Sequence, residues 1–258
     1  MPPFSDHLIR RLRQARRVGV LTGAGISAES GVPTFRDPDG LWQRFKPEEL
    51  ANVNAFITNP TLVQGWYAHR RAVVEDVEPN AGHYALAELE RYVTEKGGDF
   101  LLATQNVDGL HTRAGSERVA ELHGSLTRTY CIDCETPATD ENLEALASGR
   151  DDAPPVGCDR CGGLLRPDVV WFGEMLPTDV FEAAERSAAA ADVYLSIGTS
   201  AVVYPAASLP LLALKHKAYV AEINPVPSDN AGWYQERIPL PAGEALPALL
   251  DAVRAESA

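Results

Sequence analysis

The sequence of 258 residues lacks long hydrophobic runs, an excess of positive charge and unpaired cysteines. No window approaches the roughly 20 consecutive apolar residues of a membrane helix, so no membrane association is expected. The 23 basic residues are outnumbered by 36 acidic ones, and the resulting net charge of −13 opposes direct nucleic-acid binding. Residues 1–17 carry positive charge without the apolar segment of a secretory signal, and we expect a cytoplasmic protein.

Cysteine is scarce, and all four cysteines fall into two Cys-x-x-Cys pairs, Cys131 with Cys134 and Cys158 with Cys161. Two intervening residues let both thiolates of a pair meet one ion, and two pairs complete a tetrahedral shell of four sulfur ligands. Two redox pairs or two disulfides are the alternatives, but the double motif is more typical of zinc. Because four thiolates leave no open coordination position, the expected Zn²⁺ is structural, and any catalyst lies elsewhere.

A glycine-rich turn follows the first predicted strand. Residues 17–22 read as a short buried strand, and the segment GAGISA of residues 23–28 comes directly after it. This is the G-x-G-x-x-G/A pattern of a strand-to-helix turn that approaches a pyrophosphate. The acidic residue that usually binds the ribose about 20 residues later is missing, and a loop of residues 33–40 stands there instead.

The remaining apolar pattern indicates an α/β fold. Three further buried strands are predicted at residues 99–104, 192–197 and 217–223. Helices are expected over residues 41–78, with a break near Asn59-Pro60, and over 83–95 and 244–254. Short apolar strands that alternate with helices favour a parallel sheet with helices on both faces. Each strand ends in small or polar residues, at the edge where such sheets bind ligands.

Taken in order, the motifs resemble those of the sirtuins, a family of NAD-dependent protein-lysine deacylases. The matching segments are GAGISAESGVPTFRDPDGLW (23–42), TQNVDGLHTRAGS (104–116), ELHGSL (121–126), the four cysteines, PDVVWFGE (167–174), GTSAVVYPAA (198–207) and IN (223–224).

The resemblance implies a large Rossmann-like NAD-binding domain and a small domain. The large domain would comprise residues 1–40, 79–127 and 166–258. The small domain would combine a helical module, residues 41–78, with a zinc-ribbon module, residues 128–165. NAD, a co-substrate, and an acyl-lysine segment of a protein would meet in the cleft between the domains.

The same resemblance assigns the catalytic base to His123, in the segment ELHG. In the family's reaction the acyl oxygen attacks the ribose carbon of NAD as nicotinamide leaves, and a base then deprotonates a ribose hydroxyl. A neutral imidazole suits that step near pH 7. His111 is the nearest rival, and its alternative role is a hydrogen bond within its own turn. Surface or capping roles are expected for the other four histidines: His7, His69, His83 and His216.

The family pattern also implies the NAD contacts. They are Gly23, Ala24, Gly25, Ser27, Phe35, Arg36, Gln105, Asn106, Asp108, Gly198, Thr199, Ser200 and Asn224. Phe35 would cover the nicotinamide site, although a loop anchor in the core is the alternative. Asn106 and Asp108 could instead only cap a strand end, which is common for these residues at turns. Asn224 would replace the missing acidic contact to the adenosine ribose.

Two groups of residues are implied to bind the acyl-lysine substrate. Val170, Phe172 and Gly173 would add the peptide backbone as a strand, although Trp171-Phe172 could be ordinary core. Tyr67 and Arg70 match the Tyr-x-x-Arg signature of bacterial-type class III sirtuins, which favour succinyl and malonyl groups and also remove acetyl. At i and i+3 they share one helix face and could hold a carboxylate. The alternative is a solvated face, with Arg71 paired to Glu75.

Rival functions remain open at this point. One is a protein mono-ADP-ribosyltransferase that uses the same NAD site. Another is a non-catalytic NAD-sensing zinc module, for which replacement of His123 would be harmless. Zinc-dependent hydrolysis is disfavoured because thiolates fill all four positions on the metal.

Overall fold

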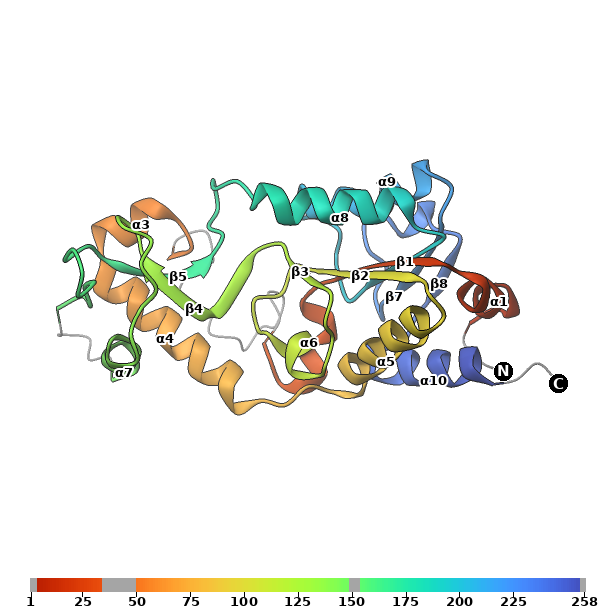
Figure 1. The fold of residues 1–258 in the computed structure, drawn as a ribbon, viewed down its shortest axis with the longest axis horizontal. Coiled ribbons are helices and arrows are strands. Elements are labelled where there is room, and N and C mark those ends of the chain that lie inside the picture. The colour runs from red at the N-terminus through yellow and green to blue at the C-terminus, as the bar shows by residue number, and fades with distance from the viewer. Residues whose placement is uncertain (1–3, 34–49, 149–153, 256–258) are drawn as a thin grey trace.

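The computed structural model describes residues 4–33, 50–148 and 154–255, and one half of the molecule is built around a six-stranded sheet (Figure 1). Its strands are β1 Arg17–Thr22, β2 Asp99–Thr104, β3 Val119–Glu121, β6 Val193–Ile197, β7 Tyr219–Ile223 and β8 Glu236–Ile238. They stand in the order β3-β2-β1-β6-β7-β8, and every neighbouring pair is parallel. The predicted parallel sheet is confirmed, while the three-residue edge strands β3 and β8 were not predicted.

Helices cover both faces of this sheet, as expected (Figure 1). One face packs against α1 Asp6–Gln14, α5 Ala81–Glu95 and α10 Ala242–Arg254, and the other against α8 Thr178–Ala190 and α9 Leu209–Lys215. Successive strand residues point to opposite faces, so Val20 joins the first core and Leu21 the second. Both side chains are fully buried, which explains why the central strands read as unbroken apolar runs.

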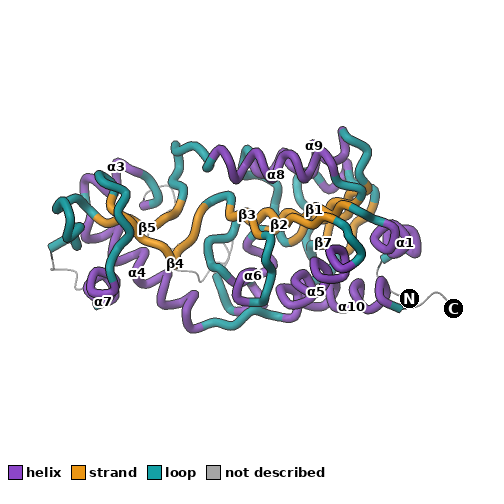
Figure 2. The backbone as a smooth tube through the Cα atoms, in the orientation of Figure 1, coloured by secondary structure: helices purple, strands orange, loops and turns teal. Residues whose placement is uncertain are grey.

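A second, two-stranded sheet lies at the other end of the molecule (Figure 2). Its antiparallel strands are β4 Gly124–Cys131 and β5 Leu165–Val169, accompanied by α3 Val53–Thr58, α4 Pro60–Asp76 and α7 Asp140–Ala147. The predicted break in the helical segment is real. Asn59 caps α4 by accepting a hydrogen bond from the Leu62 backbone N–H at 3.2 Å, and Pro60 occupies the first turn.

The strand order of the large sheet indicates the edge at which a ligand can bind. Strand β1 lies between β2 and β6, and Thr22, Thr104 and Ile197 stand level at the carboxyl ends of the three strands. The strand order reverses at β1, which is the point where open parallel sheets bind ligands. None of the helices in the described part of the chain is both long enough and apolar enough to cross a membrane.

Candidate active site

A cleft of about 1420 Å³ opens at this edge and extends to the smaller sheet. It exceeds the roughly 300–1000 Å³ of a typical small-molecule pocket, so a dinucleotide and a peptide side chain can share it. Every described residue predicted to bind NAD or substrate lines it, together with His123: Gly23, Ala24, Gly25, Ser27, Gln105, Asn106, Asp108, Gly198, Thr199, Ser200, Asn224, Tyr67, Arg70, Val170, Phe172 and Gly173. Phe35 and Arg36 lie outside the described residues.

Two glycines allow the loops after β1 and β6 to touch. The Gly25 N–H donates to the Gly198 carbonyl oxygen at 2.8 Å, and a Cβ on Gly25 would lie only 2.7 Å from that oxygen. Gly198 itself has a φ of 58°, in the left-handed region that favours glycine. Side chains at either position would push the loops apart, so the glycine pattern serves this loop contact as well as any phosphate.

A polar network joins the loops that follow β1 and β2. The Ser27 hydroxyl donates to Asp108 Oδ2 at 2.7 Å, and Asn106 Nδ2 donates to Ser27 Oγ at 3.0 Å. Asp108 Oδ1 also accepts from the Leu110 N–H at 3.0 Å, so the capping alternative describes part of its role. Burial raises the pKa of Asp108, and the bonds from Leu110 and Ser27 oppose this shift. The network therefore fixes polar groups against the cleft before any ligand binds.

Below this network lie two buried histidines. His83 is fully buried, with Nε2 3.4 Å from Ser27 Oγ, and its ring centroid is 4.8 Å from that of His111. Burial lowers the pKa of His83 to about 4 and that of His111 to about 3, so both rings are neutral at pH 7. The expected capping role of His83 is confirmed, because its Nδ1 lies 3.3 Å from the Asn80 N–H, but a surface position is wrong.

The local turn bond proposed for His111 is also wrong. His111 belongs to α6 Leu110–Arg113, and its Nε2 lies 2.9 Å from Thr22 Oγ1, on β1. The ring is thus held from a strand 89 residues away in the sequence. It does not line the cleft, which removes it as a rival base.

Another part of the cleft wall is held together by hydrogen bonds between residues that follow three strands of the large sheet. Gln105 Nε2 donates to Thr199 Oγ1 at 2.9 Å, and Asn224 Nδ2 donates to the Thr199 carbonyl oxygen at 2.9 Å. These contacts join the loops after β2, β6 and β7, so the predicted ribose and phosphate residues form one connected surface.

His123 stands between β3 and β4, where the large sheet passes into the small one. Its Nδ1 lies 3.0 Å from the Gln105 carbonyl oxygen. A carbonyl can only accept, so in the neutral ring Nδ1 carries the proton and Nε2 keeps its lone pair. Burial lowers the pKa of His123, against an opposing effect of the Gln105 bond. The ring is therefore prepared to act as a base at neutral pH.

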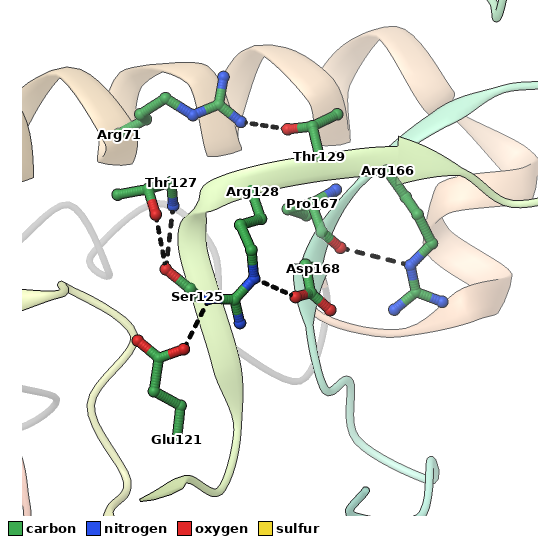
Figure 3. Close-up of polar contacts among 9 residues, drawn as sticks. All are labelled: Arg71, Glu121, Ser125, Thr127, Arg128, Thr129, Arg166, Pro167 and Asp168. Carbon is green, nitrogen blue, oxygen red and sulfur yellow. Dashed lines mark hydrogen bonds and ion pairs between the residues drawn. The ribbon is translucent and has the colours of Figure 1, made fainter. Parts of the chain in front are cut away.

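The side chain of Arg128, on β4, links the two sheets through Glu121 and Asp168 (Figure 3). Arg128 donates to Asp168 Oδ2 at 2.6 Å on β5 and to Glu121 Oε2 at 2.7 Å on β3. The Val170 N–H donates to the His123 carbonyl oxygen at 3.0 Å. The catalytic candidate and the predicted peptide-binding segment are thus held side by side.

The predicted acyl residues lie on the cleft wall formed by α4. Tyr67 is only 2% exposed, and the Cζ atom of Arg70 lies 4.8 Å from the Trp66 ring centroid. Burial lowers the pKa of Arg70 from its ordinary value. The solvated-face alternative is wrong, because Arg71 too is buried and donates to the Leu126 carbonyl oxygen and to Thr129 Oγ1 (Figure 3).

Trp171 and Phe172 behave differently. Trp171 is 1% exposed and belongs to the core with Tyr67, as the core alternative held, whereas Phe172 is 50% exposed on the cleft. Sequence reasoning missed the pair that shapes this segment. Arg166 and Glu174 form a bidentate ion pair at 2.6 and 2.9 Å; Glu174 ends the matching segment PDVVWFGE but was given no role, and Arg166 lies outside every motif.

The four cysteines form a compact cluster away from the cleft. Their Sγ atoms all lie within 4.8 Å of one another, with separations of 3.5 Å for Cys131–Cys161 and 3.7 Å for Cys134–Cys158. A tetrahedron with Zn–S bonds of about 2.3 Å has edges of about 3.8 Å, so the donors fit zinc. The separations far exceed a disulfide bond of about 2.05 Å, which contradicts the two-disulfide alternative.

Comparison with known sequences identifies the family. The model of the Sir2 family matches residues 23–205, and the chain belongs to this family, the sirtuins. It is 50% identical over 243 residues to NAD-dependent protein deacylase 2 of Pyrobaculum aerophilum, covering 94% of this chain and 93% of that protein. It is 52% identical over 221 residues to an NAD-dependent protein deacylase of Thermus thermophilus, covering 85% of this chain and 83% of that protein.

Solved structures agree with this assignment. A Sir2 homologue in complex with NAD superposes with a TM-score of 0.88 at 45% identity, over 97% of this chain and 94% of that one. A Sir2 variant with a deacetylated p53 peptide and 3′-O-acetyl-ADP-ribose superposes with a TM-score of 0.84 at 31% identity, over 97% and 98%. The sirtuin fold expected from the motifs is therefore confirmed.

Proposed function

We propose that this chain is an NAD-dependent protein-lysine deacylase in which His123 is the general base. One observation carries the proposal: His123 stands between the polar network of Ser27, Asn106 and Asp108 and the segment that begins at Val170, and all of them line one cleft. A base at this junction can reach a cofactor on one side and a peptide side chain on the other. The domain division given above belongs to the same proposal.

The residues of the cleft then have separate roles in the reaction. Bound NAD supplies the ribose carbon that accepts the acyl oxygen as nicotinamide leaves; one water molecule is consumed as lysine is released, and the products are nicotinamide, free lysine and O-acyl-ADP-ribose. Asn106 and Asp108 orient the nicotinamide ribose, and His123 Nε2 takes the proton of a ribose hydroxyl. Backbone groups of Val170, Phe172 and Gly173 hold the peptide as an added strand.

The acyl groups removed are acetyl and the dicarboxylic succinyl and malonyl groups. A carboxylate at the end of the acyl chain would meet the Arg70 guanidinium and the Tyr67 hydroxyl on the cleft wall. The natural partners are acyl-lysine segments of other proteins. A cytoplasmic location fits the four clustered cysteines without disulfide bonds, because thiolates that bind zinc persist in a reducing compartment.

The test compares acetyl-lysine and succinyl-lysine forms of one peptide, with and without NAD, by mass spectrometry. NAD-dependent loss of succinyl at least as efficient as loss of acetyl is expected. Removal of acetyl alone would keep the deacylase and refute the acyl pocket. If ADP-ribose moved to protein, or NAD bound without nicotinamide release, a transferase or a sensing module would replace the proposal.

A variant series identifies the base. His123→Ala should lose about 10²–10⁴-fold in deacylation rate. It should still bind NAD, because the NAD-binding groups come from other residues. His216→Ala, at an exposed position at the end of α9, is the matched control and should retain wild-type rates. Full activity of His123→Ala would refute the assignment.

A further inference from the structure

We propose that Trp171 is a positioning residue for acyl selectivity: its indole N–H fixes the Tyr67 hydroxyl as a hydrogen-bond donor to the carboxylate of a dicarboxylic acyl group. The inference rests on the acyl pocket proposed above and deepens it. It concerns a buried side chain that the motif comparison assigned either to no role or to ordinary core.

The hydrogen bond itself carries the argument. Trp171 Nε1 lies 2.9 Å from Tyr67 Oη, and both residues are buried. An indole N–H can only donate, so the Tyr67 oxygen must accept. The hydroxyl proton of Tyr67 cannot point along this bond and has to point elsewhere.

A second donor stands beside Tyr67. The Arg70 guanidinium lies beside the Tyr67 ring, with its Cζ atom 5.5 Å from the ring centroid. A guanidinium also only donates. The Tyr67 O–H group, directed away from the indole, and the Arg70 guanidinium are therefore two donors on one wall of the cleft. A carboxylate, which only accepts, is the group that completes this arrangement.

The hydroxyl keeps its proton throughout the physiological range. Burial raises the pKa of Tyr67 to about 12, against the lowering effects of Arg70 and of the Trp171 bond. The nearby Glu174 carboxylate is engaged by other donors, because its oxygens accept from Arg166 and from the Trp171 backbone N–H at 2.7 Å. Tyr67 therefore offers a donor that pH does not switch off.

The indole is held rigidly enough to set this direction. The Arg166 guanidinium lies over the Trp171 ring, with its Cζ atom 3.6 Å from the ring centroid. Arg166 is held by its ion pair to Glu174 and donates to the Val169 carbonyl oxygen at 2.9 Å. The same clamp shapes residues 169–174, so the peptide-binding backbone and the acyl pocket share one support.

The experiment measures a selectivity ratio, kcat/KM for a succinyl peptide divided by kcat/KM for the acetyl peptide. Trp171→Phe keeps an aromatic ring and removes the N–H, and should lower the ratio roughly fivefold, the order expected for one hydrogen bond. If Trp171→Phe folds poorly, β-(3-benzothienyl)alanine at position 171 keeps the shape of the indole and replaces its N–H with sulfur.

A double-mutant cycle separates this role from simple packing. Tyr67→Phe should lower the ratio by itself, and adding Trp171→Phe should lower it no further. An unchanged ratio in Trp171→Phe, or an equal additional loss in the Tyr67→Phe background, would overturn the inference. If Tyr67→Phe leaves the ratio unchanged, the acyl pocket itself is wrong and this inference falls with it, whereas deacylation by His123 would stand.

Discussion

The environment of His123 determines the pH range in which it can act as a base. Burial lowers its pKa below the ordinary 6.5, and the Gln105 carbonyl oxygen holds the proton of the neutral ring on Nδ1. Only the neutral ring can accept a proton, so activity is lost as pH falls through this lowered pKa and is fully present above it.

We therefore expect kcat/KM to stay level from about pH 8 to 7 and to decline only below pH 6.5. The measurement is a pH profile of kcat/KM for the acetyl peptide, with NAD saturating. His216→Ala should give the same acid limb. An acid limb centred above pH 7 would contradict a buried, neutral base.

Single residues were predicted well where a local motif requires them. The glycines of residues 23–28 and the polar strand ends could be found because their chemistry depends on neighbouring residues in the sequence. His83 and Trp171 were judged less well. His83 contacts Ser27 and Trp171 contacts Tyr67, and each of these partners lies far outside the local sequence window of the residue it contacts. No local pattern reports such contacts.

At the scale of elements, a buried ion pair supports the loop that follows β7. Glu222 Oε1 accepts from the Ser228 N–H at 3.1 Å, and Glu222 Oε2 lies 3.3 Å from Arg237 Nε, on β8. Arg237 donates in turn to the carbonyl oxygens of Asn224 and Pro225 at 3.3 and 2.9 Å. The Glu222–Arg237 pair thus holds the loop after β7 at both of its ends, Asn224 and Ser228.

Glu222→Gln should lower the free energy of unfolding by about 2–3 kcal/mol. This is less than the roughly 3–5 kcal/mol of a fully buried pair, because Arg237 keeps a third of its side-chain exposure. Urea unfolding measures the loss, and calorimetry should show weaker NAD binding because the loop lines the cleft.

The control is an exposed pair on α8. Arg186 and Glu182 are 68% and 57% exposed, and Arg186→Gln should change stability by less than about 1 kcal/mol. Equal effects of the two substitutions, or unaltered NAD binding by Glu222→Gln, would show that the buried pair does not hold the loop.

The strands of the large sheet that the sequence predicted are the buried central ones. Strands β1, β2, β6 and β7 are buried on both faces and stand out as apolar runs. Strands β3 and β8 have three residues each and lie at the edges of the sheet. So short a segment carries no recognisable period, and only pairing with β2 and β7 makes it a strand.

At the scale of the whole molecule, the cysteine cluster stabilises a module with little core of its own. The buried core of this module consists of three residues, Cys131, Cys158 and Leu165, and two of them are cysteines of the cluster. Zinc binding therefore has to supply the folding free energy that apolar burial does not.

Removal of zinc by a strong chelator should lower the melting temperature by roughly 10 °C or more, since several kcal/mol of metal binding are lost. Deacylation should fall and return when Zn²⁺ is restored, with one zinc per chain by elemental analysis. A zinc-free protein with an unchanged melting temperature would contradict the structural role. Loss of activity alone would not identify a catalytic metal.

The sequence by itself predicted the parallel sheet, the four-cysteine cluster and many of the residues that line the cleft. The sheet and the cysteine cluster follow from local patterns, namely apolar runs and Cys-x-x-Cys pairs, whereas the cleft residues follow from their match to the family's motifs. The tertiary structure decided which nitrogen of His123 is free, that His83 and His111 are buried and neutral, and how Trp171 meets Tyr67. Those properties arise from partners brought together by folding across long stretches of chain, and burial and hydrogen-bond direction exist only once the partners have met.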